Sequence, residues 1–305
     1  MYSIVVPVYN EQETIPALYE RVKKVIDTLD TSCEVVVVDD GSADGSLDLL
    51  KAMHRKDPRF KIVSFSRNFG HQVAISAGID HAEGDAVMII DGDLQDPPEV
   101  LPHFIEKWKE GYDVVYAVRT KRKENIFKRA AYAIFYRLLK RLSYLDIPLD
   151  SGDFCLLDKR VVQAMRKLPE RLRFVRGLRT WVGFRQVGLP YERERRFAGS
   201  PKYTFTKLLG LAYDGIFSIS TTPLRLAVYS GFGLAALAFI GGLLVIYDKL
   251  VYGIAIVGWA STIVIITFLG GVTLSTLGMI GEYVSRIYEE VKSRPLYVVK
   301  EKLGL

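Results

Sequence analysis

The chain has 305 residues, of which 49% are hydrophobic and 25% are charged. This balance excludes a wholly disordered chain. The formal net charge is +6, and such a basic excess is typical of proteins that bind nucleic acid, anionic membranes or phosphorylated substrates. Two long apolar segments near the carboxyl end favour membrane and phosphate, so we expect no nucleic-acid partner.

Residues 2–118 alternate short apolar runs with segments of helical periodicity, and each apolar run predicts a buried strand. The expected strands are 2–7, 34–38, 61–65, 86–90 and 113–118, and the expected helices are 12–29, 44–54, 71–82 and 98–110. This alternation predicts an α/β fold, a mostly parallel sheet with helices on both faces. Such sheets bind ligands beyond the carboxyl ends of their strands, where this sequence places several aspartates.

Two amphipathic segments follow. Residues 122–145 carry apolar side chains on one side and basic side chains on the other, and residues 203–222 hold an apolar stripe at helical spacing. Two interpretations of 122–145 remain open: a helix packed on the sheet with a solvated basic face, or a helix lying on an anionic bilayer. We interpret 203–222 as a membrane-interface helix.

Two charge-free segments, Leu226–Tyr247 and Ile254–Gly281, come next. Roughly 20 apolar residues cross a bilayer core, so we expect two transmembrane helices within 224–281, joined as a hairpin through Asp248–Gly253. Lys and Arg residues gather on both flanks of the pair, whereas the link holds only Lys249. The positive-inside rule therefore predicts that both flanks lie in the cytoplasm.

The strongest local motif is Asp91-Gly92-Asp93, directly after an expected buried strand. Two carboxylates with one residue between them at a strand end can share a divalent cation with a diphosphate, and oxygen ligands suit Mg²⁺ or Mn²⁺. Aspartates are also common in ordinary loops, so the position of this pair after the strand gives the motif its weight.

Two further strand ends carry polar residues. Asp39 and Asp40 follow the second expected strand, and carboxylates there can accept hydrogen bonds from a nucleobase or a ribose. Tyr9, after the first strand, could stack on a base, and Glu11 could hydrogen-bond a ribose. The alternative is a pair of ordinary turns with helix caps.

These three motifs together resemble the family 2 glycosyltransferases with the GT-A fold, which is Rossmann-like. Further motifs resemble the polyprenyl-phosphate glycosyltransferases, a group that includes dolichol-phosphate mannose synthase and the bactoprenol glucosyltransferases. These motifs are Ser66–His71, Asp93–Pro98, Ser151–Phe154, Arg173–Gly177 and Gly199–Tyr203. The likeness extends over nearly the whole chain, and its last part is most similar to the bacterial glucosyltransferases.

The resemblance implies a role for each matching residue. The residues that it assigns to nucleotide binding are Pro7, Tyr9, Glu11, Asp39, Asp40 and Asp91. It gives the metal and the diphosphate to Asp91 and Asp93, and places Gln95 near the donor sugar. The basic residues that would face phosphate or the acceptor are Arg119, Arg173, Arg176 and Lys202.

The reaction implied by the resemblance is inverting transfer of a sugar, with UDP-glucose favoured as donor, to a polyprenyl (undecaprenyl or dolichyl) phosphate. The catalytic residues would be Asp91, Asp93 and Asp153. The role of Asp153 stays open between orienting the acceptor, acting as a weak base and contacting a sugar hydroxyl. Alternatives are a GDP-mannose, UDP-amino sugar or UDP-pentose donor, and, in another class, a non-catalytic membrane scaffold that binds nucleotide.

The predicted organisation has four parts. Residues 1–202 form a cytoplasmic GT-A catalytic domain, 203–222 an interface helix, 224–281 two transmembrane helices and 282–305 a cytoplasmic tail. We therefore expect a multi-pass protein of the cell (inner) membrane whose termini and catalytic domain are cytoplasmic. A homo-oligomer formed through the transmembrane helices is a further hypothesis.

Overall fold

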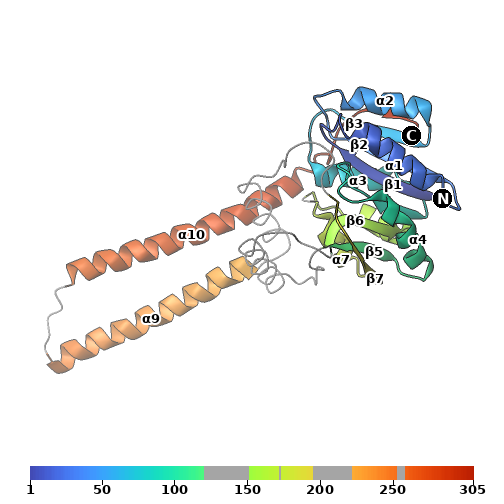
Figure 1. Ribbon diagram of the computed structural model, residues 1–305. Helices are drawn as coiled ribbons and strands as arrows, with labels where there is room; N and C mark the ends of the chain where they lie inside the picture. The colour runs from blue at the N-terminus through green and yellow to red at the C-terminus, as the bar shows by residue number, and fades with distance from the viewer. Residues whose placement is uncertain (120–150, 172, 195–221, 253–257) are drawn as a thin grey trace. The chain divides into compact units, whose positions relative to one another are not determined.

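The computed structural model describes residues 1–119, 151–171, 173–194, 222–252 and 258–305 (Figure 1). The chain divides into two compact units, a sheet domain that includes Arg294–Leu305 and a second unit that contains the two long helices. The predicted helix 122–145, the predicted interface helix 203–222 (all but its last residue) and Lys202 lie outside the described residues.

The sheet domain is built on a mixed sheet. Its strands are β1 (Tyr2–Val8), β2 (Cys33–Asp39), β3 (Phe60–Phe65), β4 (Ala86–Ile89), β5 (Val114–Arg119), β6 (Ser151–Asp158), β7 (Gln186–Tyr191) and β8 (Val299–Leu303). Their order is β7-β5-β6-β4-β1-β2-β3-β8. The neighbours β4, β1, β2 and β3 run parallel, as do β5 and β7, whereas β6 and β8 pair antiparallel. The predicted mostly parallel α/β sheet is confirmed.

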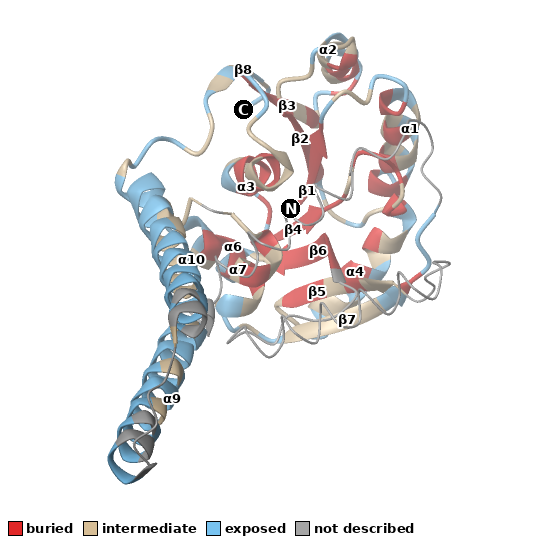
Figure 2. Ribbon diagram, turned by 90° about the vertical axis from the view of Figure 1, so that its left-hand side faces the viewer, coloured by how far each residue is buried: buried red, intermediate tan, exposed pale blue. Residues whose placement is uncertain are grey.

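Helices cover both faces of this sheet (Figure 2). One face carries α1 (Ile15–Ile26), α2 (Ser46–Lys56) and α4 (Leu101–Lys109), which follows the short 3₁₀ helix η1 (Pro98–Val100). The other carries α3 (His71–His81), α6 (Lys159–Arg166) and α7 (Val175–Trp181). The sequence explains the layering, because strands such as β2 are apolar throughout and are buried on both faces.

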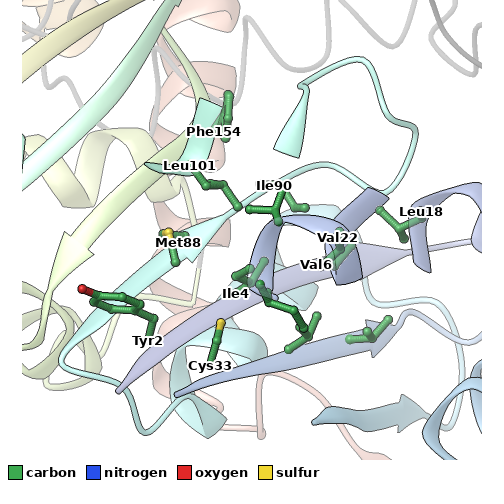
Figure 3. Close-up of a cluster of buried hydrophobic side chains, with 14 of the residues drawn as sticks. Tyr2, Ile4, Val6, Leu18, Val22, Cys33, Met88, Ile90, Leu101 and Phe154 are labelled. Atoms are coloured by element: carbon green, nitrogen blue, oxygen red, sulfur yellow. The ribbon is translucent and has the colours of Figure 1, made fainter. Parts of the chain in front are cut away.

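The larger core shows how the helix spacing produces burial. In α1, Leu18 and Val22 lie four residues apart, on the same side of the helix. They pack toward Ile4 and Val6, which alternate along β1 (Figure 3).

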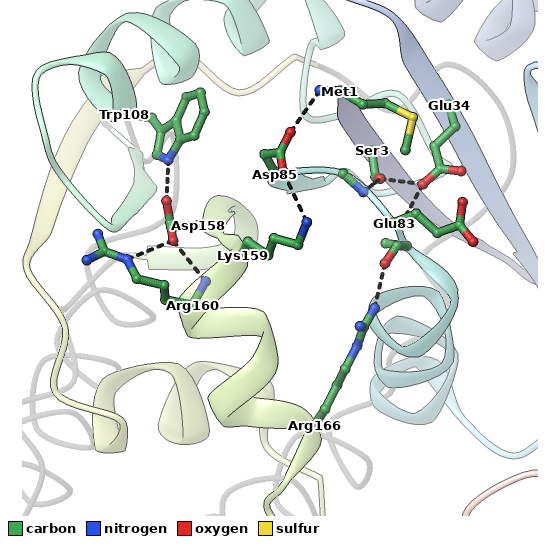
Figure 4. Close-up of polar contacts among 12 residues, drawn as sticks. Met1, Ser3, Glu34, Glu83, Asp85, Trp108, Asp158, Lys159, Arg160 and Arg166 are labelled. Atoms are coloured by element: carbon green, nitrogen blue, oxygen red, sulfur yellow. Dashed lines mark hydrogen bonds and ion pairs between the residues drawn. The ribbon is translucent and has the colours of Figure 1, made fainter.

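Polar side chains close the amino-terminal edge of the sheet (Figure 4). Trp108 Nε1 donates to Asp158 at 2.8 Å, and the same carboxylate caps α6 by accepting the backbone N–H of Arg160 at 2.8 Å. The amino terminus of Met1 pairs with Asp85 at 3.0 Å. These groups are paired with one another.

The end of the chain differs from the predicted tail at 282–305. Helix α10 (Trp259–Val291) continues ten residues past Gly281, and Val299–Leu303 then joins the sheet as β8 beside β3. Sequence reasoning missed β8 because its alternating charged residues, in Val-Lys-Glu-Lys-Leu, suit an exposed edge strand rather than a buried one.

The second unit contains α9 (Thr222–Tyr252) and α10, which contact each other. The segments Leu224–Leu244 and Val264–Val291 are long and apolar enough to cross a membrane, judged by length and composition. Helix α9 runs through most of the predicted link Asp248–Gly253, so the connection lies further along the chain than the charge pattern indicated.

Candidate active site

The candidate active site lies along the edge of the sheet where the carboxyl ends of the parallel strands meet. Because β4 and β1 run parallel, Asp91 after β4 and Tyr9 after β1 reach the same edge. Strand β6 runs antiparallel to β4 with Ile89 opposite Cys155, and this register carried two residues further brings Asp91 level with Asp153. The antiparallel strand therefore delivers a second carboxylate beside the first.

His71, the first residue of α3, lies between these two carboxylates. Its Nε2 is 3.5 Å from Oδ1 of Asp91 and 3.6 Å from Oδ2 of Asp153. Burial alone would lower the pKa of His71, but the two carboxylates outweigh burial and raise the pKa to about 9. The imidazole is therefore a positive charge between two carboxylates at neutral pH.

The buried carboxylate of Asp153 receives hydrogen bonds from two side chains. Arg176 donates from Nε to Oδ1 at 2.8 Å and from Nη2 to Oδ2 at 3.2 Å, and Gln72 Nε2 donates to Oδ2 at 2.8 Å. Burial alone would raise the pKa of Asp153, but Arg176 and His71 hold this pKa well below its usual range. Asp153 is thus ionised at neutral pH and is a poor proton acceptor.

Asp91 differs from Asp153 in that its Oδ1 is buried and accepts no hydrogen bond. Burial raises the pKa of Asp91 to about 6, with His71 opposing the increase and the Asp96 and Asp153 carboxylates adding to it. His71 lies 3.5 Å from this oxygen as an ion-pair partner and makes no hydrogen bond to it, so the oxygen keeps its capacity to bind a further cation or donor. Asp91 is therefore suited to bind a positively charged group.

The predicted metal pair is completed by Asp93, whose Oδ1 accepts the backbone N–H of Gln95 at 3.1 Å. Across the described ranges, no three His, Cys, Asp or Glu side chains form a ready-made metal cage. Mg²⁺ is commonly held by one or two carboxylates together with substrate phosphates, so a carboxylate pair that a diphosphate completes fits this ion. The metal itself stays a prediction.

Asp39, predicted to bind the nucleotide, lies at the end of β2 and is 1% exposed. Its Oδ1 accepts the backbone N–H of Ser42 at 3.0 Å, and its Oδ2 accepts Ser64 Oγ at 2.8 Å. Both carboxylate oxygens therefore bind protein donors, which fixes the loop after β2. Direct contact with a nucleotide stays a prediction.

Asp40, also predicted to bind the nucleotide, holds the loop that leads into α3. Its carboxylate accepts the backbone N–H groups of Phe69 at 2.7 Å and Gly70 at 3.0 Å. The next residue, Gly41, has φ +67°, and a Cβ there would lie 2.3 Å from the carbonyl carbon of Arg67. Asp40 and Gly41 therefore fix the loop just before His71.

The loop after β1 is joined to the loop after β2. The backbone N–H of Glu11 donates to Ser46 Oγ at 2.9 Å, and the Glu11 side chain accepts Thr14 Oγ1 at 3.1 Å. Pro7 is buried within β1, whereas Tyr9 is 37% exposed at the edge of the sheet. Of these predicted nucleotide residues, Tyr9 offers the most surface to a base.

The predicted phosphate-facing residues are placed differently from one another. Arg119 ends β5 as predicted, and Arg176 pairs with Asp153. Arg173 instead donates from Nη2 to the backbone oxygen of Leu168 at 3.0 Å.

Sequence reasoning missed four residues that the structure brings to this edge. His71 and Asp96 lie inside motifs that carried the resemblance, so a signal for them existed. Gln72 and Tyr191 had no such signal. The role of Gln72 depends on α7, where the backbone N–H of Val175 donates to Gln72 Oε1 at 2.9 Å. The role of Tyr191 depends on the position of β7 in the sheet.

Opposed carboxylates and cations at the carboxyl edge of a mostly parallel sheet define an α/β protein with a site suited to phosphate-bearing ligands. The family model described as glycosyl transferase family 2 matches residues 3–166. The chain therefore belongs to this family of glycosyltransferases, and the resemblance drawn from its motifs is confirmed.

Relatives match nearly the whole chain. The protein named uncharacterized glycosyltransferase YkcC of Bacillus subtilis is 51% identical over 305 residues, which cover 100% of this chain and 94% of that protein. The SfII prophage-derived bactoprenol glucosyl transferase of Shigella flexneri is 44% identical over 300 residues, covering 98% and 97%. Among solved structures, glucosyl-3-phosphoglycerate synthase of Mycobacterium tuberculosis has a TM-score of 0.48 and 19% identity over 71% of this chain and 77% of that one.

Proposed function

We propose that this glycosyltransferase moves glucose from UDP-glucose to a polyprenyl phosphate, giving a polyprenyl-phosphate glucose. The observation that carries the proposal is the charged edge of the sheet, where Asp91, His71, Asp153 and Arg176 lie together. The full-length likeness to a bactoprenol glucosyl transferase supports both the sugar and the lipid.

The reaction needs little help from a base. The second pKa of a phosphate monoester is near 6, so a polyprenyl phosphate is mostly dianionic at neutral pH. One of its oxygens attacks the anomeric carbon, the new carbon–oxygen bond forms as the bond to the diphosphate breaks, and UDP leaves. In-line attack inverts the anomeric centre.

The main barrier is repulsion between two phosphate-bearing substrates, and the chain supplies cations against it. Arg119 and Arg176 are the candidates for screening this charge, because guanidinium groups bind phosphate through paired donors. In this proposal Asp153 is not the base: it holds Arg176 in place, and Gln72 fixes the Asp153 carboxylate from the other side.

Asp91 and Asp93 are the residues that would hold Mg²⁺ or Mn²⁺. The Oδ1 atom of Asp91, which pairs with His71 but accepts no hydrogen bond, supports this part of the proposal. When bound, the ion would neutralise the departing diphosphate. A polyprenyl phosphate is a membrane lipid, and the apolar segments Leu224–Leu244 and Val264–Val291 support a site at a bilayer surface.

The test is transfer of labelled sugar into lipid. Membranes that contain the full chain are supplied with a polyprenyl phosphate and, in separate reactions, labelled UDP-glucose, GDP-mannose or a UDP-amino sugar. We expect labelled lipid from UDP-glucose and background from the other donors. Label from another donor would refute glucose, and an absence of labelled lipid from every donor would refute the reaction.

A further inference from the structure

A chain of polar contacts joins three residues beside the proposed carboxylate pair. Strands β5 and β7 run parallel with Arg119 opposite Tyr191, and Arg119 Nε donates to the Tyr191 hydroxyl at 3.4 Å. The hydroxyl donates in turn to Oδ1 of Asp96. One tyrosine thus links a carboxylate to a guanidinium.

Asp96 is the buried end of this chain. The residue is 1% exposed, and its Oδ1 also lies 3.5 Å from Nε of Arg193. Its Oδ2 is buried and has no hydrogen-bond partner. Burying a carboxylate is costly unless charges compensate it, and here the compensating cations are Arg193 directly and Arg119 through the tyrosine.

Tyr191 is fixed at its ring as well as at its hydroxyl. Its ring packs edge-on against Phe154 of β6, with centroids 5.4 Å apart at 76°, and Phe154 packs on Phe104 of α4 at 4.8 Å. Just beyond β7, the backbone N–H of Glu194 donates to the carbonyl oxygen of Gln95 at 3.0 Å. The hydroxyl therefore has little freedom to move.

Arg119 is restrained at both ends of its guanidinium. Tyr191 accepts from Nε, and Nη2 lies over Gly152, where a Cβ would be only 3.2 Å away. Gly152 immediately precedes Asp153, so the guanidinium lies close to the site residues. In the group formed by Asp96, Arg119 and Arg193, one carboxylate faces two guanidiniums, so Asp96 alone does not neutralise both cations.

We infer that Asp96 and Tyr191 are positioning residues that hold Arg119 toward a phosphate group of a substrate. This inference rests on the proposed function, in which both substrates carry phosphate. The phosphate belongs either to the nucleotide diphosphate or to the polyprenyl acceptor, and the same guanidinium chemistry serves both. The experiment below separates these two sources.

The test measures equilibrium binding rather than turnover. Full-length protein in detergent is titrated calorimetrically with UDP in one series and with farnesyl phosphate in another. Tyr191→Phe keeps the ring packing and removes only the hydroxyl, so we expect about tenfold weaker binding of one of the two ligands. Weakening of UDP binding assigns Arg119 to the donor, and weakening of farnesyl phosphate binding assigns it to the acceptor.

The chain offers a matched control. The Tyr2 hydroxyl donates to Asp30 at 3.3 Å, which is the same pair of groups at the opposite edge of the sheet. Tyr2→Phe should leave the affinity for both ligands unchanged. Similar melting temperatures of the two variants would show that a change in affinity does not come from unfolding.

A double-mutant cycle distinguishes positioning from a general structural effect. If Tyr191 acts through Arg119, Tyr191→Phe adds nothing to the affinity loss already caused by Arg119→Gln. Asp96→Asn removes the charge while keeping an acceptor for the hydroxyl, and it should weaken the same ligand as Tyr191→Phe. Additive losses, or unchanged affinity for both ligands in Tyr191→Phe, would overturn the inference.

The outcome is separable from that of the proposed function. If the wild-type protein transfers glucose and Tyr191→Phe binds both ligands normally, the proposed function stands and the positioning role is refuted. If the protein binds the ligands through Arg119 but makes no labelled lipid, the positioning role stands and the proposed function is refuted. A wild-type protein that binds neither ligand contradicts both.

Discussion

At Asp153 the contacts argue against a catalytic base. Its oxygens accept from Arg176 and Gln72, and its pKa is held well below the usual range, because the charge of Arg176 and the contact with His71 outweigh burial. A lowered pKa means that the carboxylate stays ionised as pH rises and loses its charge only in strong acid. Its titration therefore contributes nothing to the rate near neutral pH.

We predict that Asp153→Ala loses activity by about a hundredfold or more. Asp153→Asn should lose less, because an amide oxygen still accepts from Arg176. Neither loss should recover between about pH 6 and pH 9, as measured in pH–rate profiles of all three proteins. Strong recovery of Asp153→Asn activity at high pH would show that Asp153 acts as a base. Full activity of Asp153→Ala would show that the residue has only a structural role.

Asp91 gives a second prediction at this scale, because its buried Oδ1 has no hydrogen-bond partner. Asp91→Asn should weaken Mn²⁺ binding, measured by electron paramagnetic resonance with UDP present, and should lower transfer by about a hundredfold or more. Asp48→Asn, an exposed aspartate on α2, is the control and should change neither. Normal Mn²⁺ binding by Asp91→Asn would remove this residue from the metal site.

Among the elements, β8 ties the end of the chain to the site domain. Tyr297 stacks on Phe65 of β3 with centroids 4.9 Å apart, and its hydroxyl donates to Asp80 at 3.2 Å. Beside it, the backbone N–H of Ser66 donates to Val298 at 2.9 Å. Residue 66 begins the loop whose far end is held by Asp40, so the two residues just before β8 support that loop from outside.

Removing the Tyr297 ring should therefore destabilise the sheet domain. We expect Tyr297→Ala to cost about 2 kcal/mol of unfolding free energy, seen as a lower melting temperature, and to weaken UDP binding. Tyr288→Ala is the control, because that tyrosine is 60% exposed on α10. Equal melting temperatures for the two variants would show that the Tyr297 contacts before β8 contribute little to the domain.

The elements also show how far the sequence could lead. Continuous apolar runs such as β2 are typical of buried parallel strands, so the parallel core could be predicted. Asp91 and Asp93 were found because they follow such a run, whereas Asp153 was found only through the Ser151–Phe154 motif that carried the family resemblance. Strand β8 could not be predicted, because an edge strand with alternating charges lacks a buried pattern. Nor could the contact of Tyr191 with Asp96, since 95 positions separate them and only the strand order brings them together.

For the whole molecule, the feature that bears on location is the pair of long apolar helices α9 and α10. Large side chains of α9 and α10 are exposed, with Phe232 at 73% and Leu274 at 71%, and none of either apolar segment is buried. Surface of this kind is unfavourable in water and favourable in lipid. We therefore propose that both helices cross a membrane.

The charge pattern then gives a topology that can be measured. Reporters fused before Met1 and after Leu305 should both respond on the cytoplasmic side, and one inserted near Lys249 should respond on the far side. The structure adds a reason for the first two to agree, because β1 and β8 belong to the same sheet. A far-side signal after Leu305 would mean that a single segment spans, and that β8 cannot pair with β3 in the membrane-bound protein.

The most direct test of the central claim is the formation of labelled lipid from a defined donor and acceptor. Membranes containing the wild-type chain, and membranes containing Asp91→Asn, are given labelled UDP-glucose and a polyprenyl phosphate, and the organic phase is counted. We predict a labelled glucosyl lipid from the wild type, its loss in excess chelator and a near-background count from Asp91→Asn. Wild-type membranes that make no labelled lipid, or Asp91→Asn membranes that make as much as the wild type, would contradict the account.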